Sequence, residues 1–265
     1  MSDNITVEQK AATRSNTTQI ANQNNYYGLT PKEACDMALQ LFYENFPKLE
    51  KIAREIVEKR MDELMKEIAQ KVEDKKIVDM SPFGDPDVQY VMYEAQKNYA
   101  RFGTKEMLSH ISELIVSRIQ HNHGKICLKV AIDKAIELVP MLTESQLDIL
   151  SLLFFTCKVK LNTIKDIHQL KEHLEEITLA FAKAELSSMS YLNMLGCLEL
   201  RLHDPVEIYA TSYNFREKDV ETICPEIIKK TRGDYTTSHI GTILAIVNAE
   251  SKTPYNFNPE IWIHD

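Results

Sequence analysis

The stretch Gly28-Leu29-Thr30-Pro31-Lys32-Glu33 separates two segments of different composition and marks the start of a long helix. Thr30 is suited to be the N-cap, because its hydroxyl can accept a hydrogen bond from a backbone N–H of the first turn. Pro31 fits the first helical position, where its missing N–H costs nothing, and Glu33 can complete a capping box. These residues predict that a helix begins at Pro31.

The segment 1–28, before this helix start, is a polar tail. It holds five asparagines and three glutamines, and it has no aromatic residue before Tyr26 and Tyr27. Alternation around Thr18 and Ile20, followed by amide side chains, would allow strands to be added between protomers. The same composition is typical of a disordered tail. We therefore expect either disorder or an oligomerising strand, with these four residues as candidate interaction residues.

The composition of the whole chain, which has 265 residues and a net charge of −8, limits the possible fold and function. Seven glycines and nine prolines in this length indicate long elements with few turns, and so favour helices. An acidic chain repels phosphate backbones, which argues against broad nucleic-acid binding. The five cysteines form no C-x-x-C pair, and no apolar stretch reaches the length of a membrane span. We expect a cytoplasmic protein without metal, cofactor or membrane association.

Residues 29–140 predict a helical bundle that begins with a long arm over residues 31–73. Pro47 either kinks this arm or starts a second helix at Lys48. An apolar stripe on the arm suits one member of an antiparallel helix pair better than a coiled coil, because its period is not strict; the stripe comprises Leu49, Ile52, Ile56, Met61, Leu64, Ile68 and Val72. A linker at residues 79–86 then precedes helices from Pro86, over 105–120 and over 125–139.

Residues 141–265 predict a winged-helix-like α+β part, so the fold class we expect is mainly α. Thr143 and Gln146 form a second capping box, and Thr163 is expected to cap the helix after it. The period changes to two at residues 198–202, which predicts one strand, and another helix follows Tyr235. The recognition helix of such a fold, residues 188–195, contains no Lys or Arg, which indicates protein contact rather than DNA binding.

The C-terminal stretch contains the only tryptophan, Trp262, between two isoleucines. An exposed Trp at this place would leave an apolar patch, so we expect the chain end to dock on the body. An added strand or an extended clasp beside residues 198–202 is the predicted form.

Two clusters invite a functional interpretation. Tyr90, Tyr93 and Arg101 belong to an aromatic and basic group that suits either a stacking platform or the wet rim of a helical core, and the rim is favoured. The run His121-Asn122-His123 lies at a helix end and lacks the spacing of a nuclease or metal site, and His168 and His173 are expected at the surface. The sequence has no nucleophile elbow, phosphate-binding loop or dinucleotide fingerprint.

Three segments together resemble a family of bacterial proteins of uncharacterised function: residues 16–30, residues 87–103 and residues 146–151, with Ile261-Trp262-Ile263 at the close. The tail is similar to Asn/Thr/Ile-rich tails of phage-defence-associated proteins, where such tails resemble β-stacking motifs. This chain departs from that pattern, because Asn22-Gln23-Asn24-Asn25 replaces the glycine-flanked spacing. The resemblance implies structural motifs and no specific chemistry.

These observations lead to one main functional hypothesis and two alternatives. The main one is a non-enzymatic cytoplasmic assembly or sensor protein that acts through protein contacts and self-association as a homo-oligomer, in a setting such as phage defence. The alternatives are a winged-helix transcriptional regulator or antitoxin-like DNA binder, and a cryptic hydrolase or nuclease effector whose site is assembled from dispersed residues.

Overall fold

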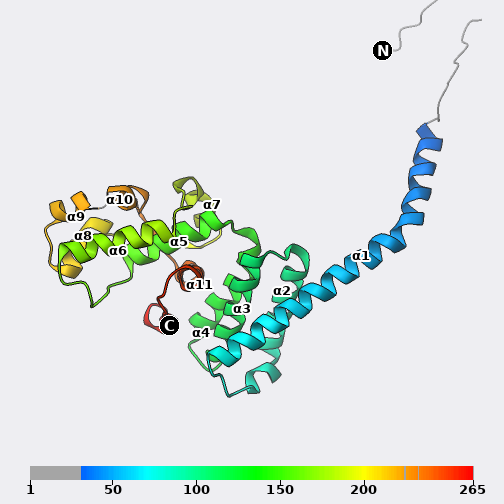
Figure 1. Cartoon of the computed structure of the whole chain (residues 1–265), viewed down its shortest axis with the longest axis horizontal. Coiled ribbons are helices and arrows are strands. Elements are labelled where there is room, and N and C mark those ends of the chain that lie inside the picture. Colours follow the sequence, from blue (N-terminus) through cyan, green and yellow to red (C-terminus); the bar gives the residue numbers. More distant parts are fainter. Residues whose placement is uncertain (1–30, 224, 232, 265) are drawn as a thin grey trace, which may run out of the picture. The chain divides into compact units, whose positions relative to one another are not determined.

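Helices make up most of the chain in the computed structural model, which describes residues 31–223, 225–231 and 233–264 (Figure 1). This part of the chain contains eleven α-helices and a single two-stranded antiparallel sheet, so the mainly α prediction is confirmed. The residues divide into two compact units, 1–54 and 55–265. The predicted divisions at residues 28 and 140 stay predictions.

The first described element is the helix α1 (Pro31–Asp74), which continues through Pro47 without a break. Of the two outcomes left open for Pro47, a separate helix from Lys48 is therefore wrong. Glu33 lies in the first turn, where an acidic side chain favours the positive end of the helix dipole. The predicted N-cap, Thr30, and the candidate tail residues Thr18, Ile20, Tyr26 and Tyr27 lie outside the described residues.

The second unit contains the end of α1 and every later element. Its helices have the following bounds: α2 (Pro86–Phe102), α3 (Lys105–Gln120), α4 (Ile126–Leu138), α5 (Glu144–Cys157), α6 (Ile167–Ala180), α7 (Met189–Met194), α8 (Pro205–Tyr213), α9 (Glu217–Ile223), α10 (Pro225–Thr231) and α11 (His239–Lys252). One continuous hydrophobic core runs through helices on both sides of residue 140, because α11 packs on α5, α4 and α3. Short 3-10 turns interrupt the connections.

Caps and breakers position these helices much as the sequence predicts. Thr143 and Gln146 form a complete capping box at the start of α5, with Thr143 Oγ1 accepting from the Gln146 N–H and Gln146 Oε1 accepting from the Thr143 N–H. Thr163 is not the cap of α6; Asp166 is, because its carboxylate accepts from the N–H groups of His168 and Gln169. The helix therefore begins at Ile167, later than predicted.

A buried arginine joins α2, α3 and α4. Arg118 is only 1% exposed. Its guanidinium donates to Asp133 at 2.9 Å, to Asp87 at 2.5 Å and to Asn122 at 2.8 Å. Burial nevertheless raises the pKa of Asp133, against the opposing effect of Arg118. The middle residue of the His-Asn-His run thus has a structural role in this arginine cluster.

The sheet consists of β1 (Leu198–Leu200) and β2 (Tyr235–Thr237), with Leu198 opposite Thr237. The strand predicted over 198–202 is confirmed for its first three residues. The start of α11 lies so close to this sheet that a Cβ on Gly241 would be 1.9 Å from the carbonyl oxygen of Cys197. Glycine at position 241 is therefore required by space.

Residues 253–264, the last ones that the structure describes, form no strand, and their aromatic rings pack against α5. The Trp262 ring lies 4.9 Å from that of Phe154 and 5.7 Å from that of Phe257, and its indole N–H donates to the carbonyl of Lys158 at 3.1 Å. Residues Pro259–Ile261 form a 3-10 turn. The predicted added strand beside residues 198–202 is therefore wrong, because β1 pairs with β2 alone among the described strands.

Candidate interaction surface

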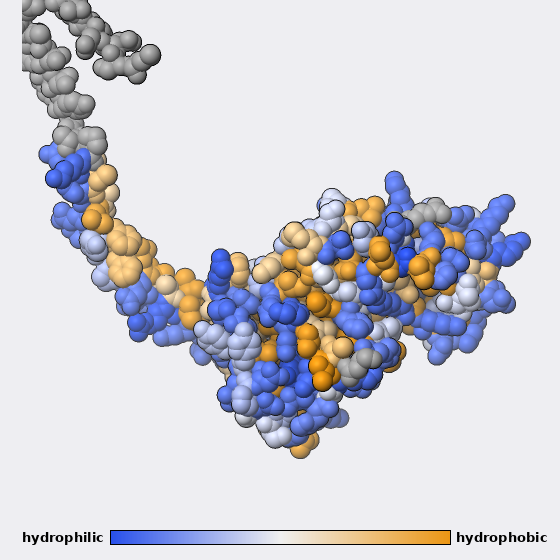
Figure 2. All heavy atoms as spheres, turned by 180° about the vertical axis from the view of Figure 1, so that it is seen from behind, coloured by the Kyte–Doolittle hydropathy of each residue, from blue (hydrophilic) through white to orange (hydrophobic). Residues whose placement is uncertain are grey.

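A row of large apolar side chains lies uncovered on residues 31–54 of α1. Leu39 is 52% exposed, Phe42 50%, Phe46 48% and Leu49 54%. Together with Cys35 before them and Ala53 after them, both also exposed, they follow one another at intervals of four, three, four, three and four residues. We call these six residues the arm face. Figure 2 shows apolar side chains along this part of α1.

The spacing of the arm face is that of a helix seam. Intervals alternating between three and four residues keep side chains on one side of an α-helix and are typical of a surface that packs against another helix. The ring centroids of Phe42 and Phe46 are 5.4 Å apart, so neighbouring rings on the row contact each other. Isolated exposed leucines need no explanation, but a continuous row of this kind marks an interaction site.

Polar side chains on the rest of this segment bond within the helix. The Gln40 amide donates to Glu44 at 3.0 Å, the Asn45 amide donates to the carbonyl of Leu41 at 2.9 Å, and Arg54 donates to Glu50 at 3.2 Å. Contacts four residues apart support a helix by only a few tenths of a kcal/mol each, about 0.2–0.5. They support the helix locally and leave its apolar side uncovered.

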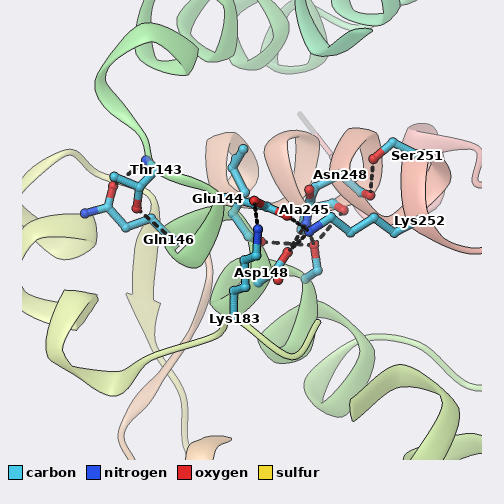
Figure 3. A network of polar contacts seen from close by, with 11 residues as sticks. Thr143, Glu144, Gln146, Asp148, Lys183, Ala245, Asn248, Ser251 and Lys252 are labelled. Carbon is cyan, nitrogen blue, oxygen red and sulfur yellow. Dashed lines mark hydrogen bonds and ion pairs between the residues drawn. The ribbon is translucent and has the colours of Figure 1, made fainter. Parts of the chain in front are cut away.

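A polar network centred on the buried side chains of Asp148 and Asn248 joins α5 to α11 in the second unit (Figure 3). The Lys252 ammonium donates to Asp148 at 2.6 Å and to Glu144 at 2.9 Å, and Lys183 also pairs with Glu144. The Asn248 amide donates to Asp148 and to Ser151. Although burial works against its charge, the hydrogen bonds to Asp148 and Glu144 raise the pKa of Lys252. Because the two lysines of the network pair with its two carboxylates, the network acts as a structural clamp between α5 and α11.

A polar cavity of about 480 Å³ lies near the end of α1, between α3 and α11. Two partly buried carboxyl groups line it, and their pKa values are shifted in opposite directions. Burial raises the pKa of Glu250, whereas Lys75 and Lys71 overcome burial and lower the pKa of Glu113. A small polar molecule fits such a cavity, but the nearby lysines already neutralise Glu113, and the backbone N–H of Phe257 bonds to Glu250.

The aromatic and basic group on α2 is only partly assembled. Tyr90 and Tyr93 are about 60% exposed, and Arg101 lies over the ring of Phe102 at 4.8 Å. Tyr99 of the same group is buried, and its hydroxyl donates to Glu63 at 3.2 Å. Tyr90, Tyr93 and Arg101 thus stand on the exposed side of α2, and whether they bind anything stays a prediction.

Two histidines of the described chain, one on α3 and one on α6, are buried. His110 and His173 are 6% and 7% exposed, so the surface position predicted for His173 is wrong. Burial lowers the pKa of each imidazole to about 4. His173 Nδ1 lies 3.3 Å from the Tyr255 hydroxyl. The sequence could have indicated that His173 is buried, because Leu170, Leu174 and Ile177 recur at helical spacing and lie on the same side of α6 as His173.

Within the part of the chain that the structure describes, no group of three His, Cys, Asp or Glu side chains is arranged to hold a metal ion. None of the described helices is both long enough and apolar enough to cross a membrane.

Comparison with known proteins gives one match. A family model covers residues 28–238, which is 211 of the 265 residues. No curated protein and no solved structure matches the chain.

Proposed function

The chain belongs to the family whose model spans residues 28–238, and we propose its function from its surface. We propose that the protein is a non-enzymatic assembly or sensor protein that acts through protein contacts and self-association. The observation that carries the proposal is the arm face, whose large apolar side chains are about half exposed. Rows of this kind are used in helix-to-helix recognition.

The proposed setting is the cytoplasm of a bacterium, in phage defence. Support comes from the resemblance of residues 16–30 to tails of defence-associated proteins and from the scattered cysteines, of which those at positions 35, 157 and 197 are in no disulfide. Free thiols are typical of a reducing compartment. The tail is a second candidate element for assembly, which the experiment below separates from the arm face.

Light scattering on the purified full-length chain tests this function. We expect a mass of at least twice the 30.5 kDa of one chain, and a mass of one chain for the double variant Phe42→Ser/Phe46→Ser. The matched control is Gln40→Ser/Glu44→Ser, which changes the same two turns away from the arm face. Deleting residues 1–28 asks whether the tail contributes. A wild-type protein that stays monomeric at high concentration would contradict the proposal.

A winged-helix regulator is the second candidate, favoured by one observation. The two-stranded sheet lies between α7 and α11 in the chain, and α11 begins directly after β2, as in the close of such folds. The absence of Lys and Arg from α7, the recognition helix of such a fold, argues against DNA binding. Titration with duplex DNA at low and high salt decides, because phosphate contacts strengthen as salt falls. Lack of binding at low salt removes this candidate.

A further inference from the structure

The segment 31–54, which carries the arm face, has an asymmetric distribution of charge along the helix. Residues 31–46 contain one basic residue, Lys32, and three acidic ones, which gives a net charge of −2. Residues 47–54 contain three basic residues, Lys48, Lys51 and Arg54, and one acidic residue, which gives +2. The segment is neutral as a whole, while the whole chain carries −8. Two copies of this segment can therefore approach without net repulsion.

Orientation decides whether the charges of two copies attract or repel. In a parallel pair, the acidic half of one copy would lie beside the acidic half of the other, and the basic halves would also meet. In an antiparallel pair, each acidic half lies beside a basic half. Opposite potentials across an interface fix its register and suppress the wrong arrangement.

The apolar side chains also fit an antiparallel pair. Placing the two-fold axis at Glu44 puts Leu39 opposite Leu49 of the second copy and Phe42 opposite Phe46. The same register puts the small Cys35 opposite the small Ala53. Every position of the arm face then faces another position of the arm face, so large side chains meet large ones and the small ones close the two ends.

We propose that the occupant of the arm face is the arm face of a second copy, in antiparallel orientation, centred near Glu44. This inference rests on the proposed self-association and adds its partner and geometry. The seam runs from Cys35 to Ala53, about 27 Å at 1.5 Å per residue. An exposed cysteine at one end of the seam makes the orientation measurable.

Disulfide mapping tests the orientation on the full-length chain. Cysteines form a disulfide only when their Cα atoms come within about 7 Å. In the antiparallel pair, the two Cys35 thiols are about 27 Å apart along the helix axis, so the wild-type protein should form no Cys35–Cys35 link under mild oxidation. The variant Ala53→Cys should instead link position 53 of one copy to Cys35 of the other, identified by peptide mass spectrometry.

The matched control is Lys51→Cys, whose side chain lies on the opposite side of the helix from the arm face; it should give no link to Cys35. A Cys35–Cys35 link in the wild type would show a parallel pair and overturn the inference. A dimeric mass without the link in Ala53→Cys would also overturn it, while leaving the proposed self-association in place. A monomeric mass would contradict both.

Discussion

Residues 31–54 and residues 61–72 of α1 carry apolar side chains at similar intervals, yet they differ in what covers them. Leu39 and Leu49 are more than half exposed, whereas Leu64 and Ile68 are 0% and 2% exposed. In the second stretch, tertiary contacts hold the helix, such as the ion pair of Lys71 with Glu113 at 3.1 Å. In the first, the side chains of Gln40, Asn45 and Arg54 form hydrogen bonds within the helix itself.

The difference shows that an amphipathic period specifies an apolar face without specifying which molecule covers it. For Leu64 and Ile68 the cover is the protein's own core. For the arm face we infer that it is another copy. The four predictions below compare the folded body, residues 55–264, with the segment 31–54. Each follows the body by the fluorescence of Trp262, the only tryptophan of the chain, which packs against Phe154.

The largest difference is expected between two phenylalanines. Phe155 is fully buried among the rings of Phe181, Tyr255 and Phe257, so Phe155→Ala should lower the free energy of unfolding of the body by about 3–5 kcal/mol. Phe42→Ala, at low protein concentration, should change it by less than about 0.5 kcal/mol. Chemical denaturation measures both. Equal losses would mean that the arm face is covered within one chain.

Ion pairs should show the same contrast. Lys252→Met leaves Asp148, which is 1% exposed, without its ammonium partner, and should cost about 2–3 kcal/mol. Arg54→Met removes an exposed pair with Glu50 and should cost at most about 0.5 kcal/mol. The denaturation midpoints of the two variants and the wild type measure these losses. A small shift of the midpoint for Lys252→Met would mean that the clamp between α5 and α11 relaxes easily.

Acid should weaken the body and not the segment 31–54, which contains no histidine. The pKa of His110 and of His173 is lowered by burial to about 4 in the folded protein. Between pH 6.5 and 4 the unfolded chain therefore binds more protons, and each histidine should reduce the free energy of unfolding by about 1.4 kcal/mol per pH unit as pH falls. Above pH 6.5 this contribution should be complete and constant.

The measurement is the pH dependence of unfolding for the wild type and for His110→Gln and His173→Gln, with the exposed His168→Gln as control. Each buried variant should flatten the slope in this window, and the control should not. A slope that all three variants leave unchanged would show that the two imidazoles are protonated in the folded protein.

The smallest effect concerns a helix cap. Thr143→Ala removes the capping box of α5 and should lower the free energy of unfolding of the body by about 1 kcal/mol. In the segment 31–54, Asn45→Ala removes only a local contact with Leu41 and should leave the body unchanged. Thermal denaturation followed at Trp262 compares the two. Equal effects would argue against a structural role for the capping box.

Local features of the fold were predictable, because they depend on neighbouring residues. The capping box at Thr143 and the start of α2 after Asp85 follow from side chains within one turn. The helix α8 was missed, although Asp204-Pro205 repeats the Asp-Pro start of α2. The Arg118 cluster and the burial of His110 depend on residues far apart in the chain, and no single segment indicates them.

The arm face was only partly predictable. Its later residues belong to the expected stripe of the long arm, but their exposure depends on the absence of a covering element within the described chain, which periodicity does not report. The charge asymmetry between residues 31–46 and 47–54 is visible in the sequence. This asymmetry indicates an orientation for a pair of helices only when the apolar side of the segment is known to be uncovered.

The most direct test of the central claim is hydrogen exchange of the backbone amides of residues 35–54 over a range of protein concentrations. A helix without tertiary cover opens readily, because most helical stability comes from packing of its apolar face. We predict that protection of these amides rises with concentration in the wild type and stays low in Phe42→Ser/Phe46→Ser, while the amides of α5 are unaffected. Equal protection of residues 35–54 at every concentration would contradict the claim that a second copy covers the arm face.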